Sequence, residues 1–269
     1  LAITSGKGGV GKSSLALGLS LCLQKLGRSV TLMDMDLGLA NLDIMCGVSA
    51  RGTLADVLYR GRSIDEVVVP GPLGVRLVPG ANGLGQLTRL DQRSRTRLLE
   101  QLRTLEDSSD IIILDTGAGV SDNVLTFCRA ADEVVVISTP EPTSVTDAYA
   151  TIKLVASTGQ YPPIGLVMNM VRTPDDLLRV GRIIPVARKY HDIRVRNLGT
   201  VPHDDVVGRA LVLRDPFVRR FPESHAALAT MALARTVATG SKPVVTLPRE
   251  SFFRRALGLL TGRAHRKVE

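Results

Sequence analysis

The sequence begins Leu1-Ala2-Ile3-Thr4-Ser5-Gly6-Lys7-Gly8-Gly9-Val10-Gly11-Lys12-Ser13-Ser14. Its apolar first residues predict the end of a β-strand, and its glycines predict a loop. The leucines from Leu15 to Leu26 predict one face of a helix. A phosphate-binding loop has the pattern G-x-x-x-x-G-K-[ST], which is matched by Gly6, Gly11, Lys12 and Ser13. A glycine-rich surface turn is the alternative, and the flanking strand and helix disfavour it.

Each residue type in this loop has a chemical reason. Glycines leave room for backbone N–H groups to turn toward an anion, and the next helix adds its positive N-terminal end. Lys12 would reach the β- and γ-phosphates of a nucleotide, and the hydroxyl of Ser13 would bind Mg²⁺. We therefore expect nucleotide contacts from the whole loop, namely Gly6, Lys7, Gly8, Gly9, Val10, Gly11, Lys12, Ser13 and Ser14.

Composition limits the class of protein. The 269 residues are 44% hydrophobic but only 3% aromatic and include no Trp, so a sizeable core must be aliphatic. Cys22, Cys46 and Cys128 are far apart, which disfavours disulfides and a zinc site and fits a reducing cytosol. No apolar run approaches the roughly 20 residues of a membrane-spanning helix, and no signal peptide is visible.

Apolar strands alternate with helical segments along the chain. Continuous apolar strands are typical of a parallel sheet covered on both faces. We therefore predict an α/β fold, a mostly parallel and doubly wound sheet flanked by helices. One domain is expected over residues 1–239, followed by a linker at 240–249 and a tail at 250–269. The predicted strands include Ile111–Asp115, Ile164–Asn169 and Leu198–Val201, and the predicted helices include Val120–Ala131, Pro174–Tyr190 and Ser224–Ala238.

Acidic residues stand at the carboxyl ends of two predicted strands, where ligands bind in such sheets. Asp115 follows four branched or apolar residues, an arrangement in which a carboxylate supports Mg²⁺ directly or through water. Its alternative role is to cap the next helix. Asp34 and Asp36 end the second strand, and alternation directs both side chains to one face of the sheet. These two acids could bind metal, orient an attacking water or form a turn.

Lys7 is a second lysine inside the loop, and with Lys12 it makes the sequence resemble the MinD/ParA family of ATPases. The resemblance implies Mg²⁺ with ATP or ADP as ligand, a homodimer in the ATP-bound state and slow, partner-stimulated hydrolysis. It implies that Lys7 crosses to the nucleotide of the facing subunit and that Asp36 orients the hydrolytic water. The catalytic residues are then Lys7, Lys12 and Asp36, and the metal is served by Ser13, Asp36 and Asp115.

Other segments carry the same resemblance. Asp36–Asp43 resembles the first switch segment of the family, and Asp115–Gly119 resembles the second, whose backbone N–H groups sense the γ-phosphate. Asn169 stands where the Asn of this family hydrogen-bonds adenine. The loop that closes over the base is matched by Val201, Pro202, His203 and Asp204. Considered alone, Asn169 and His203 would more often form turns.

The sequence further resembles one branch of the family, the flagellar-number regulators of the FlhG/FleN type. The segments that carry this likeness are Asp36–Asp43, Asp115–Asn123, Thr139–Thr143 and Thr146–Tyr149. It implies control of flagellar number or placement, with a signal-recognition-type GTPase and switch-complex proteins as partners. A ParA-like partition ATPase that binds DNA is one alternative, disfavoured because no helix-turn-helix is apparent. A MinD-type ATPase that places the septum is the other.

The C-terminal tail is basic and amphipathic. From Arg249 onward, six basic and two acidic residues supply half of the net charge of +8. Plotted as a helix, the tail has one apolar arc and one polar arc, and three more basic residues follow. The apolar arc is Phe252, Phe253, Ala256, Leu257, Leu259 and Leu260; the polar arc is Arg254, Arg255, Gly258 and Thr261; Arg263, Arg266 and Lys267 follow.

This pattern predicts a helix that lies on an anionic membrane. Docking on its own domain or on a partner is the alternative. The membrane reading places the protein in the cytoplasm, peripherally on the inner face of the cell membrane. The predicted lipid contacts are Phe252, Phe253, Arg254, Arg255, Leu257 and Leu260.

Overall fold

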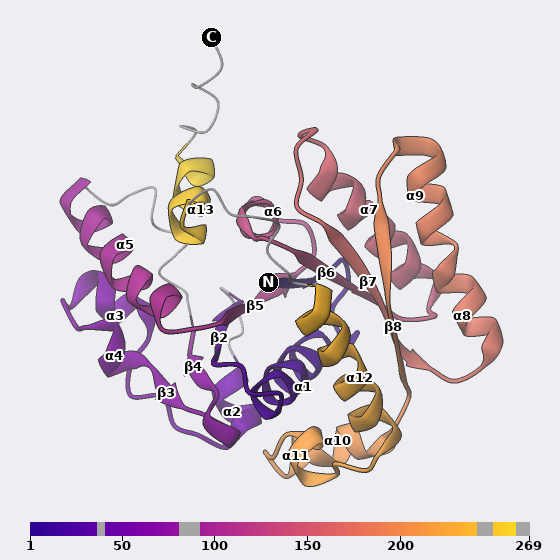
Figure 1. Ribbon diagram of the computed structural model, residues 1–269, viewed down its shortest axis with the longest axis horizontal. Coiled ribbons are helices and arrows are strands. Elements are labelled where there is room, and N and C mark those ends of the chain that lie inside the picture. The colour runs from indigo at the N-terminus through magenta and orange to yellow at the C-terminus, as the bar shows by residue number, and fades with distance from the viewer. Residues whose placement is uncertain (37–40, 81–91, 241–249, 262–269) are drawn as a thin grey trace.

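The computed structural model describes residues 1–36, 41–80, 92–240 and 250–261 (Figure 1). Three of the sequence predictions fall wholly or partly outside these residues. They concern the middle of the first switch segment (37–40), nearly all of the linker (241–249), and the basic residues Arg263, Arg266 and Lys267.

An eight-stranded sheet forms the centre of the described structure, with the strand order β3-β4-β2-β5-β1-β6-β7-β8. All neighbouring pairs are parallel except β3–β4, which is antiparallel. The predicted α/β class and mostly parallel sheet are therefore confirmed. The strands are β1 (Ala2–Ser5), β2 (Val30–Met35), β3 (Val69–Pro70), β4 (Arg76–Val78), β5 (Ile111–Ala118), β6 (Val134–Ser138), β7 (Ile164–Val171) and β8 (Val195–Pro202).

Helices connect the parallel strands and cover both faces of the sheet (Figure 1). The first six are α1 (Lys12–Lys25), α2 (Leu42–Cys46), α3 (Leu54–Tyr59), α4 (Ile64–Val67), α5 (Gln92–Asp107) and α6 (Asp122–Ala130). The others are α7 (Pro142–Ala156), α8 (Pro174–Gly181), α9 (Ile183–His191), α10 (Asp205–Val212), α11 (Phe217–Arg220), α12 (His225–Gly240) and α13 (Phe252–Leu260), with a short 3₁₀ helix at Pro72–Gly74.

Two apolar clusters, one on each face, hold the sheet between the helices. In β6, Val134 and Val136 belong to the cluster that includes side chains of α5, α6 and α7, whereas Val135 and Ile137 belong to the cluster built on α1 and α12. This alternation is what a strand buried on both faces requires, because successive side chains point to opposite sides. Aliphatic residues supply nearly all of both clusters, as the composition predicted.

The sequence-based boundaries were wrong at several elements. Strand β5 continues three residues beyond Asp115, and β7 continues two residues beyond Asn169. The single helix predicted over Pro174–Tyr190 is two helices, α8 and α9, that meet at Arg182. The eight-residue strand β8 exceeds its four-residue prediction, and the short elements α2, α10, α11 and β3 were not predicted.

Helix α13 packs its apolar face against α6 and α5 instead of standing apart from the domain (Figure 1). Phe253, Ala256 and Leu257 are buried there, and Phe252 packs edge-on against Phe253. Arg255 donates hydrogen bonds to the backbone oxygen of Ala130 (2.8 Å) and to Asp132 Oδ1 (2.8 Å). The described residues include no helix that is both long and apolar enough to cross a bilayer.

We expect Phe253→Ala to undock α13 because a helix of nine residues is held by its packing and not by its own hydrogen bonds. Truncation of a buried Phe costs about 3–5 kcal/mol in typical cores. Hydrogen exchange should therefore accelerate in α13 and in the facing part of α6. Phe252→Ala, at the half-buried neighbour, should have a smaller effect. Unchanged exchange in Phe253→Ala would contradict this account of the docking.

Candidate nucleotide-binding site

The loop between β1 and α1 has the geometry of an anion-binding turn. Gly9 and Gly11 adopt left-handed backbone angles, with φ of 79° and 82°, and Gly11 is the N-cap of α1. A Cβ atom on Gly6 would overlap the main chain of Asp147 in α7. Glycine is required at these three positions for conformation or for space, and the loop is left free to aim its backbone N–H groups at a ligand.

Lys12 and Asp115 form a buried ion pair under this loop. Lys12 Nζ lies 2.6 Å from Asp115 Oδ1, and the two side chains are only 8% and 2% exposed. The pairing follows from the sheet order, because β1 and β5 are neighbours and Ile3 is in register with Asp115. Burial raises the pKa of Asp115, and the Lys12 ammonium opposes that rise.

The polar side chains around Lys12 suit a divalent cation that is shared with phosphates. Ser13 Oγ lies 3.4 Å from Lys12 Nζ, so a hydroxyl and a carboxylate flank the same ammonium group. Hard oxygen donors of this kind are what Mg²⁺ prefers. Within the described residues, no group of three or more Asp, Glu, His or Cys side chains could by itself coordinate a metal ion. The remaining ligands would therefore be phosphate oxygens and water.

Asp34 does not take the metal-facing role that strand alternation left open. It is 2% exposed in β2, and its carboxylate accepts hydrogen bonds from the backbone N–H groups of Asp36 (3.1 Å), Asn41 (3.0 Å) and Leu42 (3.2 Å). Burial raises the pKa of Asp34 to about 6 even though these three N–H groups favour the ionised form. Asp34 thus hydrogen-bonds to both ends of the first switch segment, at Asp36 and at Asn41–Leu42.

Asp36 lies at the entrance to the second switch segment. Its carboxylate would be 3.8 Å from a Cβ atom added to Gly117, and its charge raises the pKa of Asp115. Asp34 is in register with Asp115 in the neighbouring strand, so these two acids are also close to each other. Asp115 thus pairs with Lys12 and lies within electrostatic range of Asp36, and the catalytic and metal-binding roles of these residues stay predictions.

Lys7 points away from the interior of its own loop. Its Nζ lies 2.7 Å from Glu141 Oε2 and 2.9 Å from Thr143 Oγ1, at the start of α7. The side chains of Lys7 and Glu141 are 35% and 62% exposed, so this pair is largely solvated. Such a pair contributes about 0–1 kcal/mol, which makes Lys7 available for another partner.

The residues predicted to contact the base occupy different environments. Asn169 is 7% exposed, and its Nδ2 donates a hydrogen bond of 2.8 Å to the backbone oxygen of Val10, which supports the loop from below. His203 lines a cavity beside the loop, and Pro202 ends β8. Asp204 accepts hydrogen bonds from the N–H groups of Val206 (3.2 Å) and Ala226 (3.2 Å) at the starts of α10 and α12.

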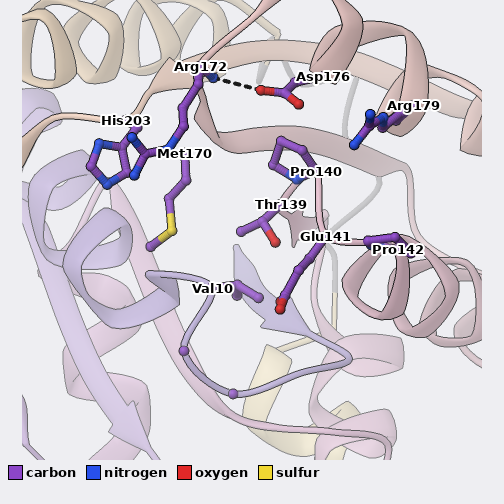
Figure 2. Close-up of a pocket in the computed structure, with 12 residues that line it drawn as sticks. Val10, Thr139, Pro140, Glu141, Pro142, Met170, Arg172, Asp176, Arg179 and His203 are labelled. Atoms are coloured by element: carbon purple, nitrogen blue, oxygen red, sulfur yellow. Dashed lines mark hydrogen bonds between the residues drawn. The ribbon is translucent and has the colours of Figure 1, made fainter.

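A cavity of about 470 Å³ extends over the outer side of the phosphate loop (Figure 2). It runs from His203, past Met170 and Thr139, to Glu141 and Pro142. Its size suits a nucleotide-sized ligand. The sequence reading had not assigned several of its lining side chains, namely Thr139, Met170, Arg172, Asp176 and Arg179. Two local signals could have indicated some of them: Thr139 begins the segment Thr139–Thr143 that carries the family likeness, and Met170 directly follows Asn169.

Residues 1–217 match the model of the CobQ/CobB/MinD/ParA nucleotide-binding domain family. The chain is 37% identical to the antiactivator FleN of Pseudomonas aeruginosa over 250 residues, which cover 93% of this chain and 89% of that protein. It is 32% identical to the flagellum site-determining protein YlxH of Helicobacter pylori, over 97% of this chain and 90% of that one.

A solved structure with a similar fold is the septum site-determining protein MinD from Pyrococcus horikoshii in complex with Mg-ADP. Its TM-score is 0.69 at 25% identity, and the alignment covers 91% of this chain and 98% of that one. This chain thus has a phosphate loop, a buried Lys12–Asp115 pair and a mostly parallel sheet. Its length, sequence and fold also match one group of proteins. This chain belongs to the CobQ/CobB/MinD/ParA family of nucleotide-binding domains.

Proposed function

We propose that this chain is a Mg-ATP-driven molecular switch that dimerises with ATP, binds the membrane through α13 and controls flagellar number or placement. It is an ATPase of the MinD/ParA type. The proposal rests on the different environments of the two lysines in the loop. Lys12 is buried at the phosphate site, whereas Lys7 is half-exposed and directed outward. Only Lys12 is placed to serve the nucleotide of its own subunit.

Nucleotide binding would replace the Lys12–Asp115 pair by two new pairs. The β- and γ-phosphates would take the Lys12 ammonium, and Ser13 and Asp115 would then be free to hold Mg²⁺, directly or through water. The Mg²⁺ ion neutralises charge on the phosphates. Asp36, held by Asp34 beside Gly117, would orient the attacking water. Hydrolysis by one subunit alone should be slow, because Lys7, the second lysine of the loop, is directed toward Glu141 and away from the Lys12–Asp115 pair of its own subunit.

A second subunit accounts for two features of the loop that the single chain leaves unexplained. Lys7 would leave its solvated partner Glu141 to stabilise the transferring charge on the facing nucleotide. Gly8 is exposed, its φ is not left-handed, and an added Cβ would meet no described atom within 4 Å. Glycine is therefore not required at Gly8 by this chain alone, but close approach by another backbone would require it.

The two lysines should separate binding from dimerisation. Lys12→Ala should abolish ATP binding, because it removes the buried cation under the loop. Lys7→Ala should bind ATP normally but remain monomeric or lose about 10²-fold or more in hydrolysis, as when one charge-stabilising donor is removed. Calorimetry, light scattering with a non-hydrolysable ATP analogue and phosphate release would measure these effects. Lys153→Ala, at an exposed position in α7, is the control. A fully active Lys7→Ala dimer would refute the role in the partner's site.

Membrane binding would compete with the docking of α13 on α5 and α6. The apolar side chains that the sequence assigns to lipid are the ones that pack on the domain here, so α13 cannot serve both surfaces at once. A physical route connects the nucleotide to this contact. Asp115 and the second switch segment lie in β5, and β5 leads directly into α6, against which α13 packs. ATP binding at one end of β5 would therefore alter the docking surface at α6.

Breaking the Asp132 contact should make membrane binding less dependent on ATP. Asp132→Ala removes an ion pair with Arg255 without changing the tail. A surface pair of this kind contributes about 0–1 kcal/mol, so vesicle binding without ATP should increase by up to about five-fold. Arg254→Ala, at the exposed neighbouring arginine, should instead weaken binding to anionic vesicles. Sedimentation with phosphatidylglycerol vesicles, with ATP and with ADP, would test both. Weaker vesicle binding by Asp132→Ala than by the unaltered chain in the absence of ATP would contradict the competition.

The flagellar role is supported by the relatives that match nearly the whole chain, the antiactivator FleN and the site-determining protein YlxH. We extend that role to this protein, with a signal-recognition-type GTPase and switch-complex proteins as partners. Deletion of the gene should change the number or position of flagella, which electron microscopy would count. The unaltered gene should restore the pattern, whereas Lys12→Ala should not. A normal flagellar pattern in the deletion strain, with displaced septa or lost plasmids, would refute this role.

A further inference from the structure

Strand β7 breaks its regular geometry at the point where it passes the phosphate loop. Met170 has a φ of 58°, in the left-handed region that side-chain-bearing residues rarely adopt. The pairing of β7 with β8 shifts its register between Met168 and Val171, so the strand is bulged at this place. Backbone strain of this kind is kept only where the surroundings impose it, and it concentrates at ligand sites.

The bulge brings two consecutive side chains to one side of the strand. In a regular strand, Asn169 and Met170 would point to opposite faces of the sheet. Here both reach Gly11: a Cβ atom added to Gly11 would lie 2.5 Å from Asn169 Nδ2 and 3.2 Å from Met170 Cε. Asn169 is used there to hold Val10. The left-handed residue is what allows Met170 to follow Asn169 to the loop.

At the loop, Met170 faces the cavity and not the core. Figure 2 shows its side chain above Val10, between His203 on one side and Thr139 on the other. His203 and Arg172 line the cavity beside Met170, whereas Asp176 and Arg179 lie farther along it, beyond Pro140 (Figure 2). A flexible, polarizable thioether is suited to lie against the flat apolar face of a base or a ribose.

We propose that Met170 is an apolar contact for the nucleoside part of ATP, and that its left-handed backbone is retained to place it there. The inference rests on the proposed function, since it requires that the cavity binds ATP. It assigns the phosphates to the loop and Lys12, and the nucleoside to a surface that Met170 supplies. Loss of Met170 should therefore weaken ATP binding but leave the binding of inorganic triphosphate, which has no nucleoside, unchanged.

Three variants separate this role from a structural one. Met170→Gly removes the side chain and relieves the strained backbone, so ATP affinity should fall about five- to ten-fold while the urea midpoint of unfolding stays equal or rises. Met170→Leu keeps an apolar side chain and should bind ATP within about two-fold of the unaltered protein. Leu73→Gly is the matched control, because Leu73 has a φ of 57° and does not line the cavity. It should relieve strain without a change in ATP affinity.

Calorimetric titration of the full chain with Mg-ATP and with magnesium and inorganic triphosphate would test the proposal. Weaker ATP binding, unchanged triphosphate binding and an undiminished urea midpoint in Met170→Gly would support it. Unchanged ATP affinity in Met170→Gly would overturn it, as would an equal loss of affinity for both ligands or a lower urea midpoint. Failure of the unaltered protein to bind ATP would instead overturn the proposed function, so the two failures are distinguishable.

Discussion

The structure depends on one buried interaction, the ion pair between Lys12 and Asp115. Removing an ammonium and a carboxylate from water costs several kcal/mol for each, and their attraction offsets this cost only while both are present and close. Each group therefore constrains the other. The pair holds the first turn of α1 against β5, and it can be broken only by a ligand that offers each group a new partner. A phosphate with a bound cation would do so for both at once, which is the basis for the proposed binding of Mg-ATP.

The sheet order makes this pair possible and also places its surroundings. Because β1 lies between β5 and β6, the loop after β1 is flanked by Asp115 on one side and by α7, which follows β6, on the other. Gly6 packs against α7 and Gly11 packs against β7, so the loop lies between two elements that come later in the chain. Because the loop lies between α7 and β7, Lys7 can reach Glu141 at the start of α7, and Met170 of β7 can contact the loop.

The sequence alone predicts the features that short patterns encode, but it does not predict contacts between residues that are far apart in the chain. The loop, the helix after it and the acid that ends the apolar run Ile111–Leu114 are encoded by short patterns, and the structure brings them together as expected. The three hydrogen bonds to Asp34 and the pairing of Lys7 with Glu141, 134 residues away, follow no local period and could not be predicted. The break between α8 and α9 and the left-handed Met170 were missed for a similar reason, because tertiary contacts there override a regular hydrophobic pattern.

The tail shows the same limit in energetic terms. An apolar helix face is stabilised by any apolar surface, since the hydrophobic effect is not directional, so its pattern cannot distinguish lipid from the groove between α5 and α6. The burial of Phe253 and Leu257 contributes similarly in both environments. The choice then depends on smaller terms, such as Arg255 capping the C-terminal end of α6 through Ala130 and Asp132. When large terms nearly cancel, a change of about 1.4 kcal/mol shifts the populations ten-fold. In the proposed switch, nucleotide binding beside β5 would need to change the docking surface at α6 by only about this amount to move α13 from one surface to the other.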